Sequence, residues 1–110
     1  MRVIIREAAY DDLDRIHAWI AKDRPRSADA VIDRILSSAE RLGQFPRMGH
    51  VGRMPGTFGW AIPRLPYIII YRIEEISGLI FVDAIFHVRK IGIEGDSRRE
   101  IAQSELVGRE

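Results

Sequence analysis

Three things are missing from this chain of 110 residues. It has no cysteine, which excludes disulfides and thiolate chemistry. Its three histidines are scattered without metal-ligand spacing, so we expect neither a structural zinc ion nor another cofactor. Its apolar runs are shorter than the ~20 residues of a membrane-spanning helix, and its N-terminal segment lacks the apolar region of a signal peptide. We therefore expect a cytoplasmic protein with one modest core.

Acidic residues are missing from the middle of the chain. Residues 41–73 contain five arginines and no acid, a charge of +5, whereas residues 1–40 carry −1 and residues 74–110 carry −3. Guanidinium groups favour planar, bidentate contacts, so this segment suits phosphate or carboxylate partners. Alternatively, its arginines cap helix ends and cover strand edges. The five are Arg41, Arg47, Arg53, Arg64 and Arg72.

Apolar residues recur at helical spacing in two neighbouring segments. The first runs from about Ala8 to Lys22 and has acidic residues in its first turns, where the helix dipole favours them. Pro25 fits the first position of a second helix that ends at Leu42, and Gly43 is expected to close it in the left-handed conformation. The short link between the segments predicts an antiparallel helical hairpin. His17 lies on the first apolar stripe, where a local hydrogen bond is the simplest explanation.

The remaining segments predict strands. Residues 2–6 favour a short strand, and residues 45–66, rich in proline and glycine, favour a loop with one short strand near residues 58–62. Two longer strands are predicted at Tyr67–Glu74 and Leu79–Val88. The predicted fold is α+β: an N-terminal strand and an antiparallel two-helix hairpin packed on a small, mainly antiparallel sheet that ends in a three-stranded meander.

The last two strands carry charged side chains whose placement depends on register. A two-residue turn at Ser77-Gly78 would place Arg72 opposite Asp83 and Ile68 opposite His87. One face would then be apolar and receive the helices, because a slip by one residue would put charge into the core. The other face would be mixed and suited to binding or catalysis. Its predicted members are Ile68, Ile70, Arg72, Phe81, Asp83, Ile85, His87 and Arg89.

The order of these elements and three motifs resemble the RelE/ParE superfamily of toxins from type II toxin–antitoxin systems, often described as plasmid stabilisation proteins. The motifs are the loop FPRMGHVGRMPGT, the strand PYIIIYRI and the closing IFHVRK. The resemblance suggests a toxin domain at residues 1–90, followed by a polar tail at 91–110 with a possible short helix. It implies neutralisation by a cognate antitoxin with a small acidic C-terminal segment. The implied contact residues are Ile68, Ile70, Arg72, Phe81 and Ile85.

Two mechanisms are implied by this resemblance. ParE-like members inhibit DNA gyrase and need no catalytic residue, and the near-neutral charge, the scarcity of lysine and the long helical hairpin favour this branch. RelE-like members cleave messenger RNA on the ribosome; that activity would use His87 as acid or base, with Arg53, Arg72 and Arg89 binding phosphate. His87 and Arg89 could instead merely end the last strand, and the protein could be an inactive member that only binds a partner.

Overall fold

Residues 1–89 are described by a computed structural model and form two helices and five strands. Lys90 and the predicted tail at residues 91–110 lie outside the described residues. The elements in chain order are β1 (Arg2–Ile5), α1 (Glu7–Ala21), α2 (Pro25–Leu42), β2 (His50–Val51), β3 (Thr57–Ala61), β4 (Tyr67–Glu74) and β5 (Leu79–His87).

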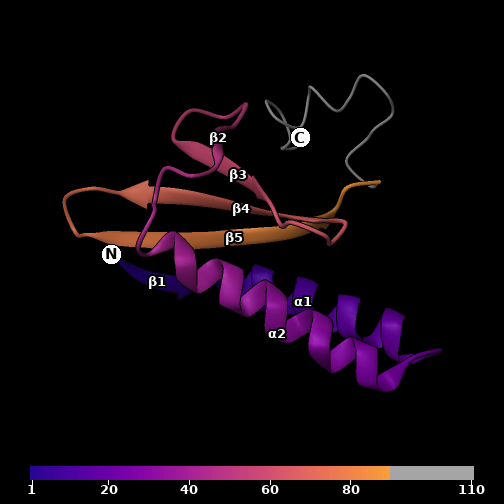
Figure 1. Ribbon diagram of the computed structural model, residues 1–110. Coiled ribbons are helices and arrows are strands. Elements are labelled where there is room, and N and C mark those ends of the chain that lie inside the picture. Colours follow the sequence, from indigo (N-terminus) through magenta and orange to yellow (C-terminus); the bar gives the residue numbers. More distant parts are fainter. Residues whose placement is uncertain (90–110) are drawn as a thin grey trace.

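The strands form one sheet in the order β1-β5-β4-β3-β2. Strands β2 to β5 pair antiparallel, and β1 lies parallel to β5 with Arg2 opposite Leu79. Figure 1 shows α1 and α2 side by side on one side of the sheet, close to β1 and β5. The predicted α+β class, with a helical hairpin on a mainly antiparallel sheet, is confirmed. The two-residue strand β2 was not predicted.

The helical hairpin follows the expected pattern with one correction. Pro25 begins α2, which ends at Leu42, and a three-residue link joins the two helices. His17 Nε2 lies 2.7 Å from the Asp29 carboxylate, so its polar contact joins α1 to α2. Gly43 has φ −65° and ψ −28°, which is right-handed, so the predicted left-handed ending is wrong. Neither helix within residues 1–89 is long and apolar enough to cross a membrane.

The core lies between the helical hairpin and the adjacent face of the sheet. The helices contribute small and branched side chains, and the strands contribute alternate residues of β4 and β5. Phe58, Trp60 and Met48 pack against its border. The buried residues of the cluster are Ala9, Leu13, Ile35, Ala39, Leu42, Ile62, Tyr67, Ile69, Tyr71, Ile80, Val82 and Ile85.

Tyr71 fastens the glycine-rich loop to this core. Its side chain is fully buried and stacks on Phe58, with ring centroids 5.4 Å apart. The hydroxyl donates to the Pro46 carbonyl oxygen at 2.7 Å and accepts from the Gly49 N–H at 3.1 Å. The Pro46 carbonyl and the Gly49 N–H, two polar groups of the loop backbone, are thereby hydrogen-bonded. The loop backbone at Pro46 and Gly49 therefore closes over the Tyr71 side chain.

The hairpin between β4 and β5 differs from the predicted register. Glu74 pairs with Leu79, so the turn has four residues, and Gly78 adopts φ +72° within it. Arg72 therefore lies opposite Phe81, two residues away from the predicted partner Asp83. Because the error is an even number of residues, Arg72 and Asp83 still share a face. Ile76 is fully exposed in this turn.

A β-bulge in β5 changes the faces of the residues that follow it. Tyr71 pairs with Val82 and Ile70 pairs with Ala84, which leaves Asp83 as the extra residue. The alternation therefore reverses, and Ile85, only 4% exposed, joins the core. Its N–H donates to the Asp12 carboxylate of α1 at 2.8 Å. The prediction that Ile85 lies on the partner-binding face is wrong, because the bulge turns this side chain toward the helices.

Candidate functional site

The sheet face opposite the helices, here called the outer face, joins apolar and charged side chains. On β4 it carries Ile68, Ile70 and Arg72, which alternate with the buried residues Tyr67, Ile69 and Tyr71. Neighbouring strands contribute side chains paired in register with these or with each other. Both helices lie on the other side of the sheet (Figure 1). The outer-face residues of the neighbouring strands are Arg2, Ile4, Thr57, Gly59, Ala61, Leu79, Phe81, Asp83, Ala84 and Phe86.

Four residues at one end of this face form the Asp83 cluster: Arg6, Arg72, Phe81 and Asp83. The Arg72 guanidinium donates from Nε to Asp83 Oδ2 at 2.7 Å and from a terminal nitrogen to Oδ1 at 3.3 Å. Arg6 Nε lies 3.7 Å from Asp83 Oδ1, too far for a hydrogen bond. Both guanidinium carbons approach the Phe81 ring, at 5.4 Å for Arg6 and 5.2 Å for Arg72. Two cations thus share one carboxylate and one aromatic ring.

The bulge explains why this ion pair forms. Asp83 is the extra residue of β5 and has no cross-strand partner on β4. The bulge lies opposite Ile70 and Tyr71, and the Asp83 side chain reaches the next residue of β4, Arg72. The hydrogen bond to Asp83 raises the pKa of the Arg72 guanidinium, with partial burial acting in the opposite direction. Arg72 is therefore a permanent cation and can bind an anion, but it cannot exchange a proton during a reaction.

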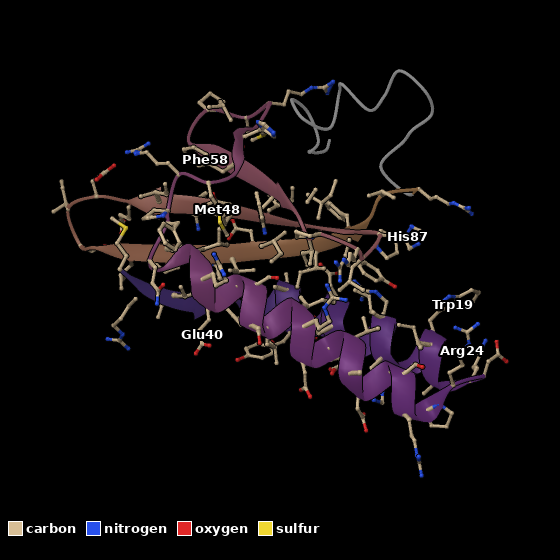
Figure 2. All side chains as sticks on the ribbon, in the orientation of Figure 1. Trp19, Arg24, Glu40, Met48, Phe58 and His87 are labelled. Atoms are coloured by element: carbon tan, nitrogen blue, oxygen red, sulfur yellow. The ribbon has the colours of Figure 1, made fainter. Side chains whose placement is uncertain are left out.

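The residues predicted for RNA cleavage fall into two separate pairs. Arg53 lies in the loop leading to Thr57, and Thr57 pairs with Arg72. His87 pairs with Tyr67, five residues before Arg72, which corresponds to about 16 Å along the strand. Arg89 follows His87 in the turn after β5. Figure 2 agrees, because His87 lies at the opposite end of the sheet from Phe58, whose neighbour Thr57 pairs with Arg72.

His87 also lies on a different face from Arg72. Its ring packs edge-on against the buried Tyr67, with centroids 5.2 Å apart and planes at 85°. Its Nδ1 accepts the Arg89 N–H at 3.0 Å, so the neutral ring in this geometry has its proton on Nε2. The predicted common face for His87 and Arg72 is wrong, because the bulge at Asp83 lies between them. These contacts give His87 a local role in ending β5.

Tyr71, the tyrosine of β4 that could in principle donate a proton during RNA cleavage, lies in the core. Its side chain is inaccessible, and burial raises the pKa of its hydroxyl. The hydroxyl proton is already donated to Pro46. A substrate on the outer face would therefore not meet this group. Within residues 1–89, no three histidines or acidic residues gather as a metal site would require.

This chain resembles known proteins in both sequence and fold. The family model described as "ParE toxin of type II toxin-antitoxin system, parDE" matches residues 3–92. The chain belongs to the ParE toxin family. A relative from Sinorhizobium fredii (strain NBRC 101917 / NGR234), named "Putative toxin Y4kP", is 41% identical over 63 residues. That alignment spans 57% of this chain and 66% of the relative, slightly less than two thirds of its length.

Two solved structures share the ParE-family fold of this chain. One is titled "Chromosomal ParDE TA system from P. aeruginosa"; it has a TM-score of 0.70 and 21% identity and covers 79% of this chain and 95% of its own. The other is the toxin–antitoxin complex RelBE2 from Mycobacterium tuberculosis, with a TM-score of 0.53 and 24% identity, covering 78% and 88%. At these identities the likeness concerns the fold. The match of the family model over residues 3–92 confirms the predicted superfamily.

Arg6 is the member of the Asp83 cluster that sequence reasoning missed. It follows β1 and is 77 residues away from Asp83 along the chain. Only the parallel pairing of β1 with β5, continued by the bond from Arg6 N–H to the Val82 carbonyl oxygen at 3.0 Å, brings it to the cluster. No spacing in the sequence signals such a pairing. A prediction that β1 lies beside the last strand would have found it.

Proposed function

We propose that this protein is the toxin of a type II toxin–antitoxin module, acts in the cytoplasm by inhibiting DNA gyrase, and is neutralised by a cognate antitoxin. Membership of the ParE family supports the toxin role. The observation that carries the choice of target is the separation of His87 from Arg72, on opposite faces and at opposite ends of the β4–β5 pair. Acid–base catalysis of RNA cleavage requires such groups around one phosphate.

The outer face supports the antitoxin part of the proposal. Ile68, Ile70 and Phe81 lie there partly exposed, beside the charged Asp83 cluster. A mixed face of this kind suits a segment with apolar and charged side chains, because apolar contact supplies affinity and charge supplies register. The two structural neighbours carry toxin–antitoxin titles, which is consistent with such a partner.

The test is a supercoiling assay with purified toxin and DNA gyrase, run beside a cleavage assay on ribosome-bound messenger RNA. We expect inhibited supercoiling and intact messages. His87→Ala should keep growth inhibition and gyrase inhibition within about threefold, because the proposed activity does not use the imidazole. The edge contact with Tyr67, worth roughly 0.5–1.5 kcal/mol of stability, and the bond from the Arg89 N–H are lost in this variant. Thermal unfolding of the variant provides the control for its folding.

Two outcomes would contradict the proposal. Cleavage of ribosome-bound messages that is lost in His87→Ala, while the variant remains folded, would identify a ribonuclease. Neither gyrase inhibition nor message cleavage, together with unimpaired growth during expression, would leave a partner-binding protein without toxic activity.

A further inference from the structure

The corner of the outer face around the Asp83 cluster carries an excess of positive charge. Arg2 and Glu74 border the cluster, since both pair with Leu79, and Glu74 also acts electrostatically on Arg72. Three arginines therefore face two carboxylates at this corner. The Glu74 carboxylate accepts the Ser77 hydroxyl at 2.7 Å and is directed toward its own turn. The corner thus has a net charge of +1 beside apolar strands.

Arg6 is the less compensated of the two arginines in the Asp83 cluster. Arg72 holds Asp83 through two contacts at 2.7 and 3.3 Å, whereas the nearest approach of Arg6 to that carboxylate is 3.7 Å. The Arg6 side chain is 51% exposed, compared with 40% for Arg72. Its guanidinium also packs on Phe81, which restricts its orientation. The Arg6 guanidinium is therefore fixed in orientation, and it has N–H donors that Asp83 does not satisfy.

The neighbouring residues indicate what kind of anion fits. Ile4 pairs with Phe81, and Ile70 and Ile68 continue along β4 away from the cluster. An apolar stripe thus leads to the arginines. A peptide with apolar side chains and one acidic residue matches this order, whereas a nucleic acid would leave the isoleucines uncovered. The low net charge also argues against a phosphate backbone, whose binding depends on several cations.

We propose that Arg6, oriented by Phe81 and adjoining Arg72, binds an aspartate or glutamate side chain of the antitoxin. Asp83 then competes with the antitoxin carboxylate for the two arginines. In the free toxin Asp83 interacts with Arg6 and Arg72, and in the complex both carboxylates interact with them. This assignment rests on the proposed function, since it specifies how the antitoxin is recognised. The assignment also fixes how the antitoxin segment lies on the outer face. Its acidic residue lies over Phe81, and its apolar residues lie over Ile70 and Ile68.

The test is the affinity of the toxin for the product of the neighbouring reading frame, measured by calorimetry on the full chains. Arg6→Gln should weaken binding about tenfold, because it removes one charge-assisted contact. Asp83→Asn should strengthen binding several-fold, because an amide keeps the shape and the bond from Arg72 Nε but removes the competing charge. The matched control is Arg26→Gln, an exposed arginine on α2.

A charge exchange completes the test. The acidic residue of the antitoxin whose change to lysine costs most affinity should regain binding with Arg6→Glu. Opposite signs for Arg6→Gln and Asp83→Asn, with unchanged unfolding temperatures, would support the carboxylate site. If Arg6→Gln, Asp83→Asn and Arg26→Gln all bind the antitoxin with equal affinity, the carboxylate site is overturned while the antitoxin role stays intact. The same holds if Arg6→Gln and Asp83→Asn both lose affinity in proportion to a loss of stability. Failure of the neighbouring product to bind at all would overturn the antitoxin role as well.

Discussion

Gly49→Ala is expected to lower the free energy of unfolding by about 3 kcal/mol, which corresponds to a fall of roughly 15 °C in the unfolding temperature of a domain of this size. A Cβ at this position would lie 2.7 Å from the Gly59 carbonyl oxygen and 2.7 Å from the Tyr71 hydroxyl. The first neighbour is backbone within β3, and the second belongs to a fully buried side chain. Neither can give way without moving the sheet.

The cost of Gly49→Ala has two parts. Pushing the loop away relieves the overlap but separates Tyr71 from Pro46 and Gly49, which leaves a buried hydroxyl without these partners. Keeping the loop in place retains the bonds but compresses the packing. Either response destabilises the folded state, because the loop and the tyrosine fit each other only without a side chain at position 49.

Gly59→Ala is the matched control for this experiment, to be followed by urea or thermal unfolding. Its Cβ would meet Ile68 and Ile70 side chains at 3.5 and 3.6 Å, ordinary van der Waals distances. We expect this variant to differ from the parent by less than about 1 kcal/mol. Equal stability of Gly49→Ala and Gly59→Ala would show that the loop is not fastened to the core through Tyr71.

Ile68→Glu should weaken antitoxin binding on the order of 100-fold and leave the toxin active. The residue lies on the outer face between Ala61 on β3 and Phe86 on β5, away from the Asp83 cluster. A carboxylate there would have to be desolvated against the apolar side chains of the partner, at a cost of about 2–3 kcal/mol. Cells producing the variant should stay growth-arrested even when the antitoxin is supplied.

Ile76→Glu provides the control, because this isoleucine is fully exposed in the β4–β5 turn. It makes the same chemical change at a site outside the outer face. We expect the antitoxin to neutralise it as well as the parent, in growth and in calorimetry. Loss of neutralisation by Ile76→Glu but not by Ile68→Glu would move the interface to the turn and contradict the account.

The elements that sequence reasoning predicted best are those with strong periodicity and defined ends. Helix α2 begins at Pro25 and ends at Leu42 as expected, since proline favours the first helical position and an apolar stripe continues to the last turn. Strand β4 also has its predicted bounds, because Pro66 precedes an uninterrupted β-branched and aromatic run. In contrast, β2 consists of two exposed residues, His50 and Val51, which carry no pattern.

The errors at the site come from residues whose side chains suit both faces. After Asp83, the three consecutive residues Ala84, Ile85 and Phe86 are all apolar, so either face of the strand could be the buried one. Alternation therefore cannot reveal the bulge that exchanges the two faces. The predicted pairing of Arg72 with Asp83 across the strands was wrong, but the two residues still form an ion pair, because a register error of two residues leaves both on the outer face. The contribution of Arg6 depends on a parallel contact between the first and last strands, which local spacing does not encode. Pattern reasoning therefore finds pairs on neighbouring strands but misses residues brought in by topology.

The central claim is that the outer face, opposite the helices, receives the antitoxin. Isoleucine methyl NMR tests it directly, because isoleucines lie on both sides of the molecule. Titration of the labelled toxin with the product of the neighbouring reading frame should shift the methyl signals of Ile4, Ile68 and Ile70. The signals of Ile16 and Ile32 on the helices and of Ile76 in the turn should stay unchanged. Shifts confined to Ile16 and Ile32, with Ile68 and Ile70 unmoved, would contradict the account.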